Sequence, residues 1–286
     1  MVQKYDTSCR KVYNMLKITF VLLIAVLFLS RQSMAESNLK FRTVAEFGFL
    51  SVLSHEIQFS KNGTNFDYVE DGGQDVLFPV TRFSAEMDIG KRNTFILLYQ
   101  PLRIETKTLL KNDVTVDNYT FQAGEGLSLL YNFPFYRASY LRELFADNPR
   151  LKLAVGLTLQ IRNATISFES TDGTGYRTNR DVGIVPALKL RGQVNLTDRY
   201  FLGVEADGIY APVSYLNGSD NEIVGAILDA SIRGGARVRL GTLFVNVRYL
   251  GGGATGTSTR DIWPGDGYVK NWLHFLIPSL GFIYSF

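Results

Sequence analysis

The side chains best suited to proton transfer near neutral pH are histidines, and this chain has only two, His55 and His274. Both alternate with apolar residues, in Leu53-His55-Ile57 and in His274-Leu276. Neither has a serine or an aspartate partner at a familiar spacing. We therefore interpret both as side chains on the apolar face of a strand, and we predict no catalytic residue.

The sequence gives no stronger support for a metal or cofactor site. Two histidines far apart in sequence are poor evidence for zinc, and neither a Walker motif nor a G-x-S-x-G elbow is present. The first long loop is acidic, but its acids do not match the spacing of a calcium-binding loop. We predict no cofactor and no metal. The acids of that loop are Asp67, Glu70, Asp71 and Asp75.

The charge distribution argues against a nucleic-acid partner. The formal net charge is +3, but residues 1–35 contain five of the 30 basic and only one of the 27 acidic residues. The rest of the chain is therefore nearly neutral and has no general electrostatic attraction for phosphate. The only cysteine, Cys9, lies in the same segment, so a disulfide framework is excluded for the remainder.

The N-terminal segment has the features of an export signal. A twelve-residue apolar run, 18–29, follows Lys11 and Lys17 and precedes Ser33-Met34-Ala35, which is a small-x-small pattern. The run is too short for a helix that spans a bilayer, which takes about 20 residues. We predict a secretory signal peptide over 1–35, cleaved after Ala35, and one domain over 36–286. A retained N-terminal anchor is the alternative.

The domain itself is dominated by alternation with a period of two residues, which is typical of β-strands. Between Arg150 and Ile161, for example, leucine, valine and isoleucine alternate with lysine, alanine, glycine, threonine and glutamine. Such segments predict about ten strands, with eight or twelve as alternatives. They cover approximately residues 41–59, 77–90, 93–109, 115–131, 150–169, 181–196, 199–213, 223–240, 243–257 and 270–286.

The predicted connections alternate between short turns and long polar loops. Residues 90–93, 196–199 and 241–242 form short turns, whereas 60–76 and 170–180 are long and rich in glycine. One long connection, 134–149, falls on the side of the short turns. Its aromatic and leucine residues have helical spacing before Asn148-Pro149, so we predict a short amphipathic helix there.

The C-terminal strand carries a recognisable pattern. Leu280, Phe282, Tyr284 and Phe286 share one face, and Phe286 is the last residue of the sequence. This pattern resembles the C-terminal assembly signal of bacterial outer-membrane β-barrel proteins. The resemblance implies an all-β, transmembrane antiparallel up-and-down barrel in the outer membrane, with both histidines near the membrane interface. It also implies two partners, outer-membrane lipid and the barrel-assembly machinery. The sequence does not indicate the oligomeric state.

If the terminal aromatic face points to lipid, the opposite face lines the lumen and carries the charges. A lipid-facing Arg or Lys costs roughly 2–4 kcal/mol near the bilayer midplane, so we expect this register to be strongly fixed. The inward set is either a structural salt-bridge network or a selective pathway with a basic strip formed by Arg233, Arg237, Arg239 and Arg248. The predicted inward residues are Glu46, Arg82, Glu86, Asp88, Arg103, Glu105, Lys152, Arg162, Lys189, Arg191, Glu205, Asp207, Asp229, Arg233, Arg237, Arg239 and Arg248.

These features predict a non-enzymatic, narrow barrel that passes or binds small solutes, or that has a surface or structural role. About ten strands leave little interior room, so we expect the lumen to be largely occluded. One alternative is an outer-membrane hydrolase that cleaves lipid or peptide. The other is a soluble secreted β-sandwich binding protein, since alternation alone does not say which face meets lipid.

Overall fold

The computed structural model describes residues 39–212, 222–258 and 265–286. The predicted signal peptide and its cleavage site after Ala35 lie outside these ranges. Within them the protein is all-β, and no helix is assigned. None of the described residues forms a helix that is long and apolar enough to cross a membrane.

The strands form one closed antiparallel barrel of ten strands. The first strand, β1, pairs with β15 on one side and with β3 on the other, and the ladder between β10 and β11 closes the circle. Two barrel strands are interrupted, one as β4 with β5 and the other as β8 with β9. The barrel elements are β1 (Leu39–Phe59), β3 (Leu77–Ile89), β4 (Asn93–Gln100), β5 (Arg103–Leu109), β8 (Gly126–Asn132), β9 (Phe135–Glu143), β10 (Leu151–Ser170), β11 (Tyr176–Asn195), β12 (Tyr200–Pro212), β13 (Glu222–Val238), β14 (Gly241–Thr257) and β15 (Tyr268–Ser285).

The outer surface carries an apolar belt. On β10, Leu157 and Leu159 are exposed, whereas the residues that alternate with them, Thr158 and Gln160, are buried. A soluble β-sandwich would turn its polar face outward, so the soluble alternative is wrong. An exposed apolar belt on a closed barrel is the surface of a protein that crosses a membrane with its strands. Other belt residues are Phe47, Phe49, Phe83, Phe95, Leu97, Ile184, Leu188, Leu202, Ile232 and Val245.

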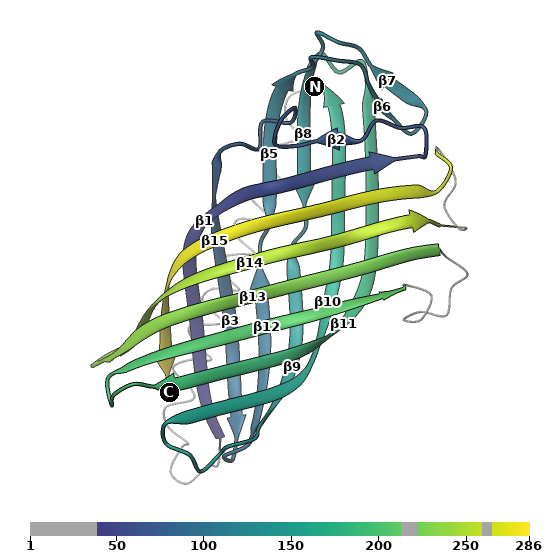
Figure 1. The fold of residues 1–286 in the computed structure, drawn as a ribbon. Coiled ribbons are helices and arrows are strands. Elements are labelled where there is room, and N and C mark those ends of the chain that lie inside the picture. The colour runs from purple at the N-terminus through teal and green to yellow at the C-terminus, as the bar shows by residue number, and fades with distance from the viewer. Residues whose placement is uncertain (1–38, 213–221, 259–264) are drawn as a thin grey trace, which may run out of the picture.

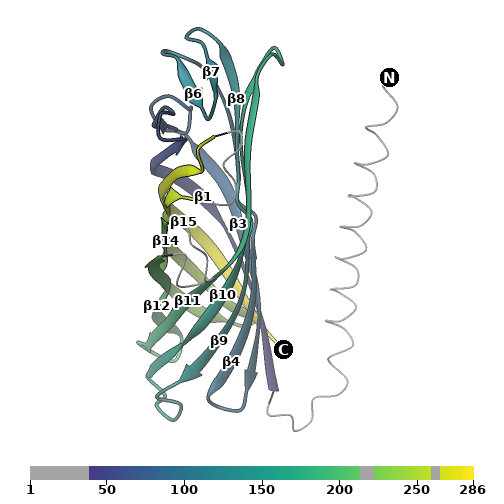
Figure 2. The same cartoon turned by 90° about the vertical axis from the view of Figure 1, so that its right-hand side faces the viewer.

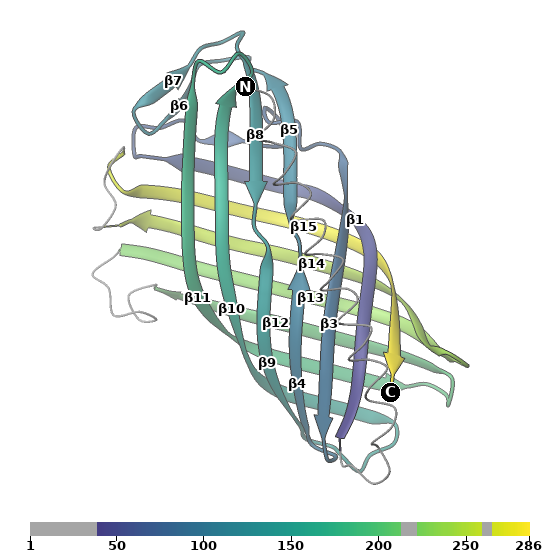
Figure 3. The ribbon, with the colours of Figure 1, turned by 180° about the vertical axis from the view of Figure 1, so that it is seen from behind.

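The barrel wall is uneven in height. Strands β12 to β15 run obliquely, whereas β5, β8, β10 and β11 stand upright and rise beyond them (Figures 1 and 3). A side view shows the upright wall continuing past the oblique strands towards the small hairpin of β6 (Val114–Val116) and β7 (Tyr119–Phe121) (Figure 2). We call the end with this hairpin the upper end, and the end with the short turns the lower end.

The helix predicted over 134–149 is wrong, and so is a continuous strand over 115–131. Residues 135–143 form β9, which continues β8 after a break, while 110–125 form the upper connection that holds the β6–β7 hairpin. Phe135, Arg137 and Ser139 are buried and alternate with outward Tyr136 and Ala138. The ladders to β4 and β10 override the helical spacing of the aromatic residues. The two longest connections that are described throughout, 60–76 and 110–125, lie at the upper end.

The barrel interior has an apolar layer at each end and a polar layer between them. At the lower end, Val44, Phe201 and Phe244 cluster inside the barrel, and Ile96, Leu141 and Ala154 form a second apolar cluster. The upper end is filled by a large apolar cluster that we call the upper plug. Its members include Leu50, Ile57, Phe66, Tyr68, Phe121, Leu127, Tyr131, Ile166, Phe168, Leu273 and Phe275.

The upper plug includes side chains from the loop that follows β1. Within this loop β2 (Phe66–Asp67) pairs with β1. Both Phe66 and Tyr68 are fully buried, and their rings pack against Phe168 of β10. The loop therefore folds into the barrel and closes its upper half with apolar side chains.

Candidate functional site

The middle layer of the lumen is a continuous set of ion pairs and hydrogen bonds, which we call the ion-pair layer. Every one of the ten barrel strands contributes at least one side chain to it. Alternation along each strand puts these polar groups inward because the lipid belt occupies the other face. The members are Glu46, Arg82, Glu86, Gln100, Arg137, Thr158, Gln160, Lys189, Arg191, Glu205, Asp207, Asp229, Arg233, Asn246, Arg248 and Ser279.

Asp229 on β13 is the acceptor for three arginines. Its Oδ2 accepts from Arg137 Nη1 at 2.5 Å and from Arg82 Nη1 at 3.1 Å, and its Oδ1 accepts from Arg248 Nη1 at 2.5 Å. All four residues are buried. Arg82 is on β3, Arg137 on β9 and Arg248 on β14, so one carboxylate links widely separated parts of the wall. A buried charge is costly without partners, and here each charge has several.

Glu205 on β12 is the second centre of the layer. Lys189 Nζ donates to its Oε1 at 2.7 Å, and Arg233 Nη2 donates to its Oε2 at 2.7 Å. Arg191 contacts Glu205 at 3.2 Å and also donates to both carboxylate oxygens of Glu86 across the lumen. The lysine and arginines of β11 and β13 therefore meet acids of β12 and β3, with both signs interspersed.

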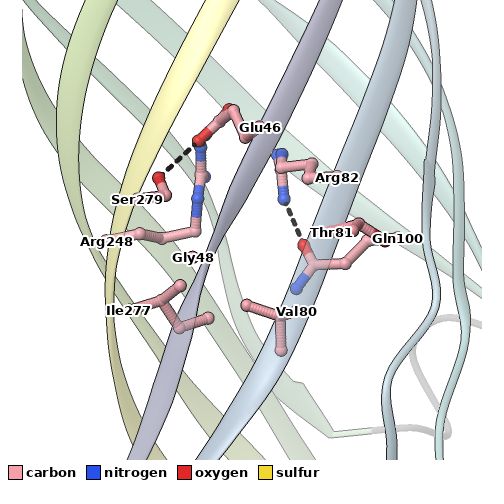
Figure 4. Close-up of a pocket in the computed structure, with 9 residues that line it drawn as sticks. All are labelled: Glu46, Gly48, Val80, Thr81, Arg82, Gln100, Arg248, Ile277 and Ser279. Atoms are coloured by element: carbon pink, nitrogen blue, oxygen red, sulfur yellow. Dashed lines mark hydrogen bonds and ion pairs between the residues drawn. The ribbon is translucent and has the colours of Figure 1, made fainter.

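A small void lies where the ion-pair layer meets the upper plug (Figure 4). Glu46 accepts there from Ser279 at 3.0 Å and from Asn246 at 2.9 Å, and Arg82 donates to Gln100 at 2.7 Å. The free volume has room for little more than a water molecule.

Eleven of the seventeen charges predicted to face inward lie in or beside the ion-pair layer. Asp88 lies at its edge, paired with Arg42 at 3.1 Å. The lumen position of these residues follows from their places on the inner strand faces. They are Glu46, Arg82, Glu86, Asp88, Lys189, Arg191, Glu205, Asp207, Asp229, Arg233 and Arg248.

The inward prediction is wrong for Arg103 and Glu105, which point outward and are 57% and 59% exposed. Ile104 on the same strand, and Leu102 just before that strand, are buried in the upper plug. The upright wall rises past the lipid belt, and there the pattern reverses, with apolar side chains inside and polar side chains in water. A rule that always assigns the apolar face to lipid fails at that height.

Four other predicted charges lie outside the ion-pair layer. Lys152 is exposed near the lower rim, and Arg162 is half-buried in the upper lumen, where it pairs with Asp181. Arg237 and Arg239 are exposed at the lower turn that joins β13 to β14. Arg237 donates to the Asp198 carbonyl and to Asn195 rather than to a carboxylate, so the basic strip of four arginines does not form.

Sequence reasoning missed two cations of this region, Arg137 and Arg42. Arg137 was hidden by the helical interpretation of its segment, although Arg137 alternates with outward Tyr136 and Ala138. Arg42 is near the lower end of β1 and pairs with Glu86 at 2.8 Å. The sequence could have indicated that Arg42 points inward, because it is two residues from inward Val44 and therefore on the same face of the strand.

The prediction that His55 is interfacial is wrong. An irregularity between Val52 and Ser54 shifts the register of β1, so that His55 turns into the barrel and is fully buried. Its ring stacks on Tyr68 at 4.4 Å between centroids, and its Nδ1 is 2.9 Å from Gln74 Oε1. This histidine therefore holds the loop after β1 inside the barrel.

His274 has a different setting from His55. It is half-buried, and its Nδ1 is 2.5 Å from the hydroxyl oxygen of Tyr249 on β14. Within the described residues neither histidine ring is hydrogen-bonded to a carboxylate.

Several buried polar atoms of the upper lumen have no hydrogen-bond partner among the described residues. They belong to the upright strands β5, β10 and β11 and to the loop after β1. Unsatisfied buried groups are costly, so these atoms indicate a place for water or for a polar ligand. The atoms are Tyr68 Oη, Gln74 Nε2, Thr106 Oγ1, Arg162 Nε and Arg177 Nε.

The upper loops are tied together by backbone donors to Asp266. The backbone N–H of Lys61 donates to its Oδ2 at 3.0 Å, and that of Tyr268 donates to its Oδ1 at 2.9 Å. These two hydrogen bonds hold the pKa of Asp266 below its usual range. The carboxylate thus joins the loop after β1 to the loop before β15.

No group of histidine, cysteine or acidic side chains within the described ranges is arranged to hold a metal ion. Asp67 instead accepts from the backbone N–H groups of Val69 and Glu70 and so stabilises a turn. Near the C-terminus, Leu280 is exposed on the belt, and the rings of Tyr284 and Phe286 are in contact.

The closed ten-stranded barrel, its apolar outer belt and its charged interior define an integral membrane β-barrel of the outer-membrane type. No protein-family model matches the sequence. No curated protein matches it either.

Solved structures with a similar fold are outer-membrane barrels. The outer membrane protease OmpT from Escherichia coli is 11% identical, with a TM-score of 0.47, over 89% of this chain and 99% of its own. A FadL homologue from Pseudomonas aeruginosa is 9% identical, with a TM-score of 0.38, over 86% of this chain and 89% of its own. The outer membrane protein OprG from the same organism is 8% identical, with a TM-score of 0.31, over 86% and 95%. None of these similarities assigns a family or a function to this chain.

Proposed function

We propose that this protein is a non-enzymatic outer-membrane barrel that binds a small solute in its upper lumen and does not conduct along its axis. The observation that carries the proposal is the ion-pair layer, to which all ten strands contribute. Asp229 and Glu205 each hold three cations, so long side chains from opposite walls meet in the middle of the barrel.

The upper lumen supports the binding half of the proposal. Its polar atoms without partners contrast with the ion-pair layer below, in which most polar atoms are hydrogen-bonded. They lie beside the aromatic rings of the upper plug, and a mixture of apolar walls and a few convergent polar groups is typical of small-molecule sites. The solute then enters from the side, because the ion-pair layer closes the lower route and the upper plug fills the upper end.

Planar bilayer recording on the purified protein tests the axial part of this proposal. We expect conductance far below that of an open porin, or none. A large, steady conductance in the unmodified protein would overturn the proposal, because it would require a continuous aqueous path through the ion-pair layer.

A further inference from the structure

The barrel wall contains a gap between β11 and β12. Strand β11 pairs with β10 along almost its whole length, from Val194 to Tyr176. Its pairing with β12 begins at Asn195 but ends at Leu188, which lies opposite Gly208. Among the described residues, 176–187 therefore pair with a neighbour on one side only. The two strands diverge above this point, β11 upright and β12 oblique (Figures 1 and 3).

The sequence explains why the ladder stops there. Pro186 lies two residues before Leu188, the last residue of β11 that pairs with β12, and proline has no N–H to donate. Proline within a sheet is confined to edges, the first residue of a strand and bulges. The residues of β12 beyond Gly208 pair only with β13, up to Pro212 opposite Val224. The pairing between β11 and β12 therefore ends at the same level on both strands.

The gap cuts into the lipid belt. On the outer face of β11, Leu188, Ile184 and Val182 are 70%, 69% and 72% exposed, and Arg180 is the next outward residue. The belt on β11 therefore continues six residues above the last pair, which is about 20 Å of strand. Across the gap Tyr210 of β12 is 74% exposed.

The interior behind the gap is formed by small residues. Gly225 of β13 pairs with Ala254 of β14, which pairs in turn with Asn271 of β15, so the three share the inner face. All are half-buried. Arg162 of β10 lies in the same upper lumen, where it pairs with Asp181 and its Nε is buried without a hydrogen-bond partner among the described residues. Small apolar residues and an unsatisfied polar atom therefore lie just inside an opening in the belt.

We propose that the gap between β11 and β12 is a lateral binding site for a single-chain anionic amphiphile from the surrounding membrane. Its hydrocarbon chain packs on the exposed Leu188, Ile184 and Val182 of β11, in continuity with the belt, and its polar head passes between the two strand edges and accepts a hydrogen bond from Arg162 in the upper lumen. Strand edges with free N–H and C=O groups are not tolerated against lipid alone. A polar head and lumen water on the inner side satisfy them. This inference rests on the proposed binding function and names its ligand class and route.

The test uses spin-labelled stearic acid with the protein in lipid nanodiscs. Electron paramagnetic resonance measures the immobilised fraction against label concentration. We compare Ala254→Phe, which fills the inner wall behind the gap, with Ala226→Phe on the neighbouring strand. Ala226 pairs with Gly253 and so lies on the opposite, outer face. Circular dichroism checks that both variants remain folded.

We expect a saturable immobilised component in the unmodified protein, at least tenfold weaker in Ala254→Phe and unchanged in Ala226→Phe. Arg162→Gln should weaken binding of the acid severalfold without changing that of its methyl ester. No saturable component, or equal binding in the two alanine variants, would overturn the inference. A non-conducting barrel that shows no saturable binding refutes the lateral site alone, whereas large axial conductance refutes the proposed function.

Discussion

Arg137 of β9 and Asp229 of β13 meet across the lumen, with Nη1 2.5 Å from Oδ2 and both side chains buried. The two residues are 92 positions apart in sequence and four strands apart around the barrel. Their contact spans the lumen rather than following the wall. This contact therefore links opposite walls of the barrel through its interior.

Removal of Arg137 should destabilise the barrel strongly. Arg137→Ala takes one of three cations from Asp229 and leaves Gln160 without its donor. Breaking a buried pair of this kind costs about 3–5 kcal/mol. Urea unfolding in lipid vesicles measures the loss. Arg142→Ala is the matched control, since Arg142 is on the same strand but exposed, and should change stability by less than about 0.5 kcal/mol. Equal effects would show that the layer is not a brace.

Neutralising Asp229 should open an anion-selective leak. In Asp229→Asn three arginines, Arg82, Arg137 and Arg248, lose the charge that holds them together and repel one another. We expect small conductance steps with a preference for chloride over potassium in planar bilayers. Asp198→Asn, in an exposed lower turn, serves as the control and should stay silent. A folded Asp229→Asn barrel without any leak would place the seal in the apolar layers instead.

The lower apolar cluster depends on a glycine. A side chain at Gly281 would put its Cβ 2.1 Å from the ring of Phe244, so the ring must move. Gly281→Ala should therefore cost about 1–3 kcal/mol of stability, the usual range for overpacking. At Gly183 a Cβ meets nothing within 4 Å, and Gly183→Ala should be close to neutral. Thermal or urea unfolding of both variants measures the difference in stability between them.

The tie between the upper loops should weaken in acid. The pKa of Asp266 is lowered by the hydrogen bonds from Lys61 and Tyr268, so its contribution is complete above the usual carboxyl pKa. That contribution is lost as pH falls through the lowered value, below about pH 4. Hydrogen exchange at the Lys61 amide, corrected for intrinsic rates, should rise there. Asp266→Asn should remove this pH dependence, and Asp172→Asn should retain it.

The architecture could be predicted because lipid imposes a strict pattern on one face of each strand. Leucine–polar alternation in β10, for example, has one satisfactory orientation in a membrane, with Leu157 outward and Thr158 inward. The same constraint brings Glu46, Glu205 and Asp229 into the lumen. Partners within the lumen were beyond prediction, since contacts such as Arg137 with Asp229 depend on barrel closure and on how the strands tilt.

The predicted side-chain orientations are wrong where contact with lipid no longer determines which face of a strand is apolar. Arg103 and Glu105 stand above the belt, where water meets the outer face and apolar groups fill the inner one. His55 was misplaced because a single irregularity between Val52 and Ser54 reverses the faces of the strand beyond it. Neither the height of a wall nor the position of such an irregularity has a local signature in one sequence.

The unequal height of the wall makes access to the barrel mouth directional. The upright strands β5, β8, β10 and β11 rise higher on one side of the barrel than the oblique strands β12 to β14 do on the other (Figure 2). Among the described residues, the upright wall therefore shields the upper end on one side of the barrel and leaves the side of β12 to β14 less covered. The described part of the upper end is therefore asymmetric, and its surface residues differ in accessibility from one side of the barrel to the other.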